Sequence, residues 1–242
     1  MSLIKFANIN TDYLKWAGLA TALQNVPTAA WTMLFGIRHN TVDTANWDAY
    51  MYLLSGVGNG VALTGLSKMN GNDVKMDTTG GPSWTTLDPA ANQDTLYVLS
   101  KATGASTPAL SKKVGAGGAW SHANGSSTYA NQAAAAQMQV GVYQGTDDPM
   151  DGWEGVLAIW NVALTQAQRI ACGANWKTSD IYAAHPTPPL LLLELNTNKD
   201  NLSNIGTAAI SSPAHSGTTL DTGQTFGGWN FDGYGAQFMS VM

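Results

Sequence analysis

Apolar and polar residues alternate along most of this chain with a period of two. In residues 31–38, WTMLFGIR, the side chains of Trp31, Met33 and Phe35 share one side of the chain. Because successive side chains of a β-strand point to opposite faces of a sheet, this pattern predicts a strand with one buried face. Segments of the same kind are found at 49–57, 60–69, 94–102, 137–145 and 155–162.

Glycine-rich segments separate these predicted strands. They occur at 70–73, 78–83, 115–118 and 145–152, and the chain contains 26 glycines in all. Short strands joined by glycine turns, with almost no helical periodicity, are typical of β-sandwiches and jelly rolls. We therefore expect an all-β fold.

One short helix is expected near residues 165–172. Thr165 is a suitable N-cap, and Gln168 three positions later completes a capping box, in which each side chain bonds the backbone N–H of the other residue. Gly173 follows the helix and can adopt the left-handed conformation that ends many helices.

A proline-rich segment at 185–189, HPTPP, divides the chain into two parts. Proline cannot join a central strand, so we expect residues 1–184 to form the main sandwich and residues 185–242 to form a β-rich C-terminal extension. The extension begins with an apolar run of leucines at 190–193. This run is too hydrophobic to lie in water, so the extension must pack either on the sandwich or on a partner subunit.

The composition excludes two classes of partner. Charged residues are 11% of the chain, less than half the usual share of about 25%, and the net charge is −5. Arg38 and Arg169 are the only arginines, and no basic stripe occurs, which argues against nucleic acid as a partner. No apolar segment approaches the roughly 18 residues of a membrane span.

The N-terminal segment and the single cysteine indicate where the protein is made. The first residues, MSLIKFANINTDYL, lack the apolar stretch and the small-residue cleavage site of a signal peptide. Cys172 is the only cysteine, so no internal disulfide is expected. We expect synthesis in a cytoplasm without a secretion signal.

Three segments resemble concanavalin A-like domains of the laminin-G-like and pentraxin-like type. They are 2–18 (SLIKFANINTDYLKWAG), 26–38 (VPTAAWTMLFGIR) and 137–171, which contains WEGVLAIWNVALTQAQRIA. The last segment is similar to the family's penultimate strand, its glycine turn, its final strand and its closing helix. The resemblance spans about residues 3–180 and implies a concanavalin A-like jelly-roll sandwich, a fold that hosts both glycan-binding modules and glycan hydrolases.

The sequence gives no sign of a catalytic site. Hydrolases that resemble this fold carry the pattern E-x-D-x-x-E, but the chain has only two glutamates, Glu154 and Glu194, and neither begins that pattern. No spacing among the fourteen aspartates singles out a pair of carboxyl groups for glycoside hydrolysis. There is also no G-x-S-x-G motif, and the histidines lie in turn-like or polar segments. We expect that the protein is not an enzyme.

An acidic turn, GTDDPMDGWEG, provides candidate metal ligands. It gathers Asp147, Asp148 and Asp151, followed by Glu154. Clustered carboxylate oxygens suit calcium, and the resemblance to pentraxin-like domains implies calcium in loops at one rim. The alternative is that these aspartates only cap a solvated turn. No cofactor is required, and calcium is a candidate.

Three tryptophans in polar, loop-like segments are candidates for glycan binding. An indole ring stacks on the apolar face of a sugar, and an exposed loop is where such a ring is accessible. The alternative is that these rings plug the ends of the sandwich. The candidates are Trp47, Trp84 and Trp120.

Two functions fit these observations. The first is a structural or interaction protein on the surface of a bacteriophage virion, such as a capsid decoration, minor tail or fibre protein. Its partners would be other virion proteins, copies of itself and a cell-surface glycan of the host. The second is a stand-alone carbohydrate-binding module. A glycoside hydrolase ranks behind both.

Overall fold

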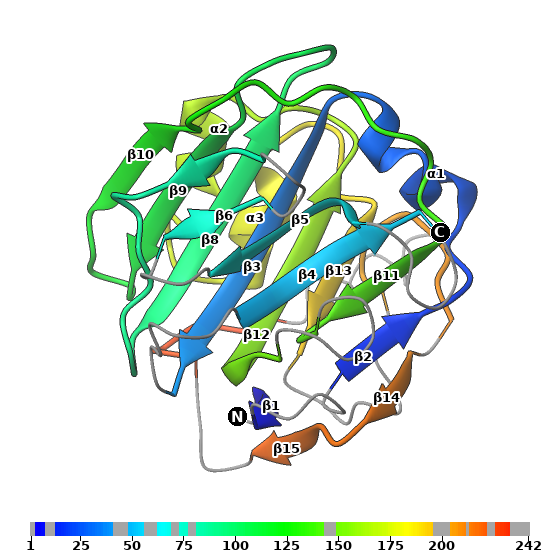
Figure 1. Ribbon diagram of the computed structural model, residues 1–242. Helices are drawn as coiled ribbons and strands as arrows, with labels where there is room; N and C mark the ends of the chain where they lie inside the picture. The colour runs from blue at the N-terminus through cyan, green and yellow to red at the C-terminus, as the bar shows by residue number, and fades with distance from the viewer. Residues whose placement is uncertain are drawn as a thin grey trace.

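The computed structural model describes residues 3–7, 13–40, 48–55, 62–68, 73–76, 81–142, 149–195, 204–211, 213–221 and 226–232. Within these residues the chain forms two antiparallel sheets packed face to face, as Figure 1 shows. The predicted all-β jelly-roll sandwich is therefore confirmed.

The larger sheet contains eight of the described strands. Seven of them follow one another across the sheet, and the eighth pairs with β12 (Asp151–Trp160) from outside this order. The order across the sheet is β10 (Trp120–Asn124), β9 (Ala109–Val114), β8 (Asp94–Lys101), β3 (Trp31–His39), β12, β1 (Leu3–Ala7) and β15 (Thr219–Asp221), with β13 (Leu191–Glu194) beside β12.

The smaller sheet contains seven of the described strands. Their order is β14 (Ala214–Ser216), β2 (Tyr13–Trp16), β11 (Gln137–Val140), β4 (Asp48–Leu54), β5 (Ala62–Lys68), β6 (Val74–Lys75) and β7 (Ser83–Trp84). The helical segments are α1 (Thr21–Gln24), the 3-10 turn η1 (Val26–Thr28), α2 (Gln166–Ala171) and α3 (Thr178–Ala183).

The main hydrophobic core lies between the two sheets. Met33, Phe35 and Ile37 on β3 share the face predicted for them and are fully buried in this core. The opposite face of β3 is buried as well, because Leu34 belongs to a second core, so the expectation of a single buried face is wrong. Leu53 on β4 and Met138 on β11 belong to the same core from the opposite sheet. One face of each sheet is thus buried against the other.

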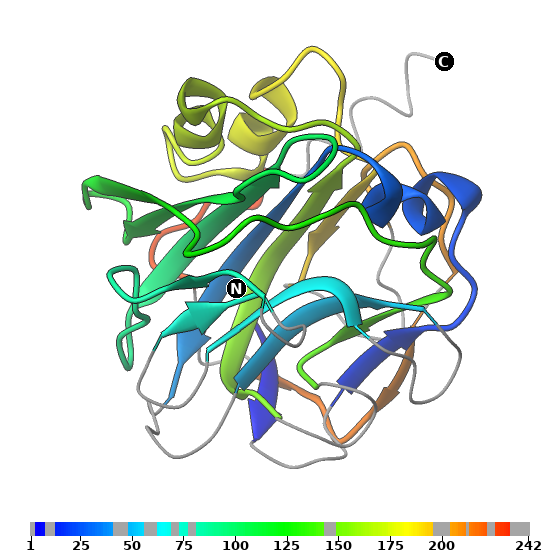
Figure 2. The ribbon, with the colours of Figure 1, turned by 45° about the horizontal axis from the view of Figure 1, so that its top comes forward.

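A second core lies on the outer face of the larger sheet. Helices α2 and α3, drawn in yellow-green and yellow, cover this face on the side away from the smaller sheet (Figure 2). Val156, Ala158 and Trp160 on β12 point toward the helices and are fully buried there. Their alternation with the inward-facing residues of β12 explains why this strand is apolar on both faces.

The capping box of α2 is confirmed. The backbone N–H of Gln168 donates to Thr165 Oγ1, and the backbone N–H of Thr165 donates to Gln168 Oε1. Gly173 does not adopt the left-handed conformation expected of it. Instead, a Cβ at this position would lie 2.8 Å from a methyl carbon of Leu96, so the glycine permits close packing on β8.

The C-terminal extension supplies strands to both sheets. In its described part, β13 pairs with β12, β14 pairs with β2 and β15 pairs with β1. Leu191 and Leu193 enter the main core and Leu192 enters the second core. The leucine run therefore packs on the sandwich, which is one of the two arrangements that its hydrophobicity predicts.

Phe226 fastens the end of the described chain to the outer face of the larger sheet. Its ring lies over Gly36 and Gly155, where a Cβ would come within 3.2 Å and 3.1 Å of ring atoms. The ring also stacks on Trp176 and meets Trp229 edge to face.

In the part of the chain that the structure describes, no helix has the length and hydrophobicity needed to cross a membrane.

Candidate functional site

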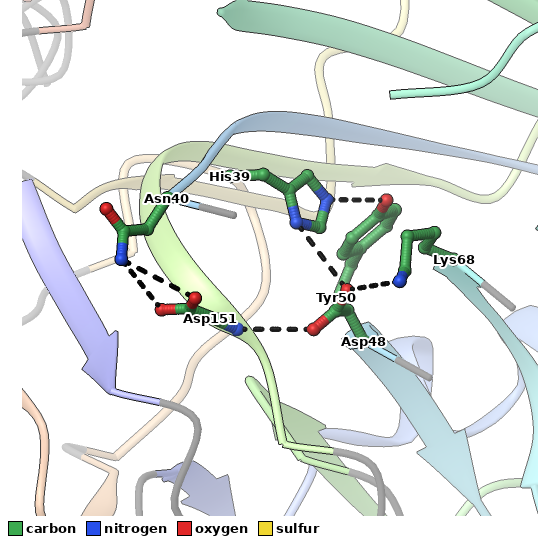
Figure 3. A network of polar contacts seen from close by, with 6 residues as sticks. All are labelled: His39, Asn40, Asp48, Tyr50, Lys68 and Asp151. Carbon is green, nitrogen blue, oxygen red and sulfur yellow. Dashed lines mark hydrogen bonds and ion pairs between the residues drawn. The ribbon is translucent and has the colours of Figure 1, made fainter. Parts of the chain in front are cut away.

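A cluster of polar side chains lies at one rim of the sandwich (Figure 3). Each member sits near the end of a strand, and the antiparallel arrangement brings these ends to the same rim. The cluster comprises His39 and Asn40 from β3 and its end, Asp48 and Tyr50 from β4, Lys68 from β5 and Asp151 from β12.

The buried part of this cluster is an ion pair between Asp48 and Lys68. Asp48 and Lys68 are direct cross-strand neighbours, and Lys68 Nζ lies 3.1 Å from Asp48 Oδ2. The other carboxylate oxygen, Oδ1, accepts a hydrogen bond of 3.3 Å from the backbone N–H of Asp151 in the opposite sheet. Asp48 therefore joins the two sheets at the rim. Burial nevertheless raises the pKa of Asp48 to about 6, against the opposing effect of Lys68.

His39 fills the space beneath the ion pair as a neutral ring. Its Nε2 lies 2.9 Å from the hydroxyl of Tyr50, and its Nδ1 lies 3.7 Å from Asp48 Oδ2. Burial, helped by the charge of Lys68, lowers the pKa of His39 to about 3. The Tyr50 ring stacks on Tyr97 at 6.2 Å between centroids, which fixes the ring against β8.

Asn40 and Asp151 form the outer part of the cluster. Asn40 is exposed and Asp151 is half-buried. The Asn40 amide donates to the two carboxylate oxygens of Asp151 over 3.4 and 3.5 Å, and the Asn40 backbone N–H donates to the Asp151 carbonyl over 3.0 Å. Long amide–carboxylate bonds of this kind are weak, so the Asn40 amide retains hydrogen-bonding capacity toward a ligand.

Glu154 does not belong to this rim. It faces the main core between Ile4 and Ile37, its cross-strand neighbours, and it is fully buried. Neither carboxyl oxygen has a hydrogen-bond partner in the described part of the chain. Burial raises the pKa of Glu154 well above its usual value, which favours the neutral, protonated acid. The expectation that Glu154 lies with the aspartates of the acidic turn is therefore wrong, because it is buried on β12.

The calcium prediction is only partly covered by the structure. Asp147 and Asp148 lie outside the described residues, while Asp151 stands at the rim. Within the described residues, no group of three or more histidine, cysteine or acidic side chains is arranged to hold a metal. Asp151 and the Asn40 amide offer oxygen ligands, but calcium takes six to eight oxygens, so these two do not form a site by themselves. Calcium binding remains a prediction.

The three tryptophan candidates have different positions. Trp47 lies outside the described residues and precedes Asp48 in the sequence. Trp84 is 2% exposed in the main core, where its Nε1 donates to the Ala123 carbonyl, so its ring is not accessible to a sugar. Trp84 plugs the sandwich, as the alternative had it. Trp120 is half-buried on β10, beside His122.

Sequence reasoning missed several residues of the cluster. His39 was expected in a turn-like or polar segment, but it lies on β3 with its ring buried. Lys68 gave one usable signal, because it shares the inward side of β5 with Leu66, where an apolar residue is the rule. A lysine at such a position predicts a buried partner of opposite charge.

The fold is similar to that of a solved pentraxin. The native heptameric SAP-like pentraxin from Limulus polyphemus matches with a TM-score of 0.52 over 91% of this chain and 94% of that chain, at 12% identity. At this identity the likeness concerns the fold alone, and it agrees with the pentraxin-like sandwich expected from the sequence. No protein-family model and no curated protein matches the sequence.

Weaker similarities exist to parts of larger proteins. Domains LG4-5 of the mouse laminin α1 chain match with a TM-score of 0.41 and 11% identity, over 68% of this chain and 44% of that chain. Trypanosoma rangeli sialidase matches with a TM-score of 0.45 and 11% identity, over 61% of this chain and 23% of that chain. None of the three proteins named is a phage protein, so the comparisons give the virion prediction no support.

Proposed function

We propose that this chain is a non-enzymatic module that binds a carbohydrate at the rim formed by Asn40, Asp48 and Asp151. One observation carries the proposal. An accessible Asn–Asp pair is held in place by a buried ion pair that links the two sheets. Binding sites need polar groups that are fixed before the ligand arrives, and residues on strands with locked neighbours meet that need.

The rim residues suit the hydroxyl groups of a sugar. The Asp151 carboxylate accepts hydrogen bonds, while the Asn40 amide both donates and accepts them. Asp48 is engaged by Lys68 and by the backbone of Asp151, so its part is to position Asp151. A pyranose that bridges Asn40 and Asp151 would satisfy two adjacent hydroxyl groups at once.

The carboxyl groups near the rim favour binding over hydrolysis. A glycosidase uses two carboxyl groups that both reach the glycosidic bond from opposite sides. Of three described acids near this end of the sandwich, Asp48 is tied in an ion pair and Glu154 is buried in the core, so Asp151 is the accessible carboxylate among them. The absence of enzymatic activity remains a proposal, and release of sugar from model glycosides would contradict it.

A second proposal places the module in a larger assembly such as a virion, in contact with copies of itself or other virion proteins. The observation that favours it is the low charge of the chain, 11%, because a weakly charged surface tolerates close packing against neighbours. Light scattering of the full chain tests this proposal. A monomer at all concentrations would count against self-assembly.

The proposed rim is tested by saccharide binding to matched variants. The wild type is screened on a glycan array, and the best ligand is titrated by calorimetry into Asp151→Asn and Asp232→Asn. Asp232 is a suitable control because it is also half-buried but lies beside Ser179 of α3. Loss of a charged hydrogen bond of about 1.5–3 kcal/mol should weaken binding by Asp151→Asn roughly 10- to 100-fold, with no change in the control. Equal affinities for all three proteins would overturn the rim assignment.

A further inference from the structure

We propose a second binding subsite at the edge of the larger sheet, where Trp120 and His122 hold a sugar ring that carries a carboxylate. This subsite is separate from the rim. Strands β8 and β9 lie between β3 and β10, and the two side chains face the outer side of the sheet, toward α2. The rim is proposed to bind the hydroxyl groups of a sugar, whereas this subsite would bind a sugar that carries an acidic group.

Trp120 and His122 form an aromatic pair on an edge strand. They are two residues apart on β10, so their side chains share one face, and both are half-buried. The rings are nearly parallel, with an interplanar angle of 7° and 6.1 Å between centroids. In the described part of the sheet β10 pairs only with β9, so the pair stands at an open edge. An aromatic side chain that is partly accessible in this way can stack on a pyranose.

A relay of hydrogen bonds fixes the protonation of the His122 ring. Arg169 on α2 donates from Nε to Ser111 Oγ over 2.8 Å, and Ser111 Oγ lies 2.8 Å from His122 Nδ1. A guanidinium group has no acceptor, so the serine oxygen must accept from it. In the described chain the serine hydroxyl has no acceptor other than His122 Nδ1. The serine therefore donates to Nδ1, and the imidazole carries its proton on Nε2.

The ring is also kept neutral. Burial and the nearby charge of Arg169 both lower the pKa of His122. Ser111 is fully buried, so the Ser–His contact does not present a nucleophile to a substrate. The relay instead prepares His122 as a neutral N–H donor with a fixed orientation, beside an indole ring. A hydrogen-bond acceptor on the ligand is the matching chemistry.

The local charge favours an acceptor that is an anion. Lys113 is the direct cross-strand neighbour of Trp120, and its Nζ donates to the Gly173 carbonyl over 2.7 Å. Arg169 is linked to His122 through Ser111, so one cation lies near each ring of the aromatic pair. Asp180 is the acid whose negative charge acts on Lys113. This is a concentration of positive charge in a chain of net charge −5. A carboxylate attached to a stacked sugar ring would accept a hydrogen bond from His122 and would be attracted by the positive charge of Lys113 and Arg169.

The test uses glucuronic acid and glucose as probes. We expect the full chain to bind glucuronic acid about tenfold more tightly than glucose, measured by titration with two-dimensional NMR. His122→Ala should reduce this preference to within about twofold, while Ser121→Ala, at an exposed position on the opposite face of β10, should leave it unchanged. His122→Gln, which keeps a side-chain donor, is the second variant if the alanine variant does not fold.

Two results would overturn the subsite. One is an equal affinity of the wild type for the two sugars, and the other is a preference that is lost in Ser121→Ala but kept in His122→Ala. The nitrogen shifts of the His122 ring give a readout that is independent of binding. A proton on Nε2 at pH 7 is expected, and a proton on Nδ1 would contradict the relay. Because the rim and the edge have separate variants, failure of one site is distinguishable from failure of the other.

Discussion

Glu154 illustrates how a single residue departs from the pattern that surrounds it. By sequence parity it shares a side with Val156, Ala158 and Trp160, which face the helices. A β-bulge between Glu154 and Val156 shifts the register, so Glu154 turns to the opposite face and enters the main core. A bulge changes which face a residue occupies without changing the hydrophobic pattern. The position of this carboxyl was therefore not predictable from alternation alone.

The buried Glu154 should make the protein less stable as pH rises above neutrality. Its folded pKa is raised from 4.5, so the folded state keeps a proton that the unfolded chain releases, and stability falls with rising pH. Asp48, raised to about 6, acts in the same direction only below about pH 6, and His39, lowered to about 3, acts oppositely only below its usual 6.5. Between pH 6.5 and 8 the effect of Glu154 remains.

Thermal unfolding of Glu154→Gln tests this account. The wild type should lose up to about 1.4 kcal/mol of unfolding free energy per pH unit between pH 6.5 and 8, because one proton is released on unfolding. The glutamine variant has no such proton and should show a nearly flat melting temperature over the same range. Parallel curves for the two proteins would show that Glu154 is ionised in the folded state.

Lys68 should be costly to remove by itself. Lys68→Met leaves Asp48 buried without its cation, and breaking a buried pair in this way costs about 3–5 kcal/mol. The double variant Asp48→Asn/Lys68→Met removes both charges and should recover part of that loss. Urea denaturation at pH 7.5, above the pKa of Asp48, measures both. A single variant as stable as the wild type would mean that the pair contributes nothing.

At the scale of elements, local signals predicted the structure well where they were complete. The capping box of Thr165 and Gln168 fixed the start of α2, and alternation located the long strands β3 and β12. Helix α3 has no side-chain cap at Lys177, so no capping signal in the sequence predicted it. Strands β6 and β7 contain two residues each, which is too short for an alternation to appear.

The contribution of the capping box is measurable. Thr165→Ala removes the acceptor for the Gln168 N–H and should lower the unfolding free energy by about 0.5–2 kcal/mol. Thr165→Ser keeps the hydroxyl and is the matched control, with a loss that should be smaller. Chemical denaturation of both variants gives the comparison. An alanine variant as stable as the serine variant would show that the cap is not needed for α2.

The rim cluster could be predicted only in part, because its members meet through strand order. Asp151 was found from the acidic turn. His39, Asn40 and Lys68 come from segments whose neighbourhood depends on how β3, β4, β5 and β12 are arranged across two sheets. Strand pairing between residues far apart in sequence leaves no local trace, so these partners emerged only with the fold.

At the scale of the whole molecule, the C-terminal part contributes strands to both sheets of the sandwich. The described strands of residues 185–242 join both sheets, and Phe226 and Trp229 cover the second core. A fragment of residues 1–184 would leave unpaired the edge of β12 that now pairs with β13, and the main core would lose Leu191 and Leu193. We expect this fragment to lack the cooperative unfolding transition of the full chain in circular dichroism. A fragment that melts like the full chain would establish residues 1–184 as an independent domain.

The most direct test of the rim as a carbohydrate site is a residue-resolved titration. The saccharide bound best on a glycan array is added to the isotope-labelled full chain, and backbone amide shifts are followed by NMR. Saturable shifts that concentrate at Asn40, at the start of β4 and at Asp151 are the predicted result. Binding of that saccharide with shifts confined to other parts of the molecule, or no saturable shift for any saccharide, would contradict the account.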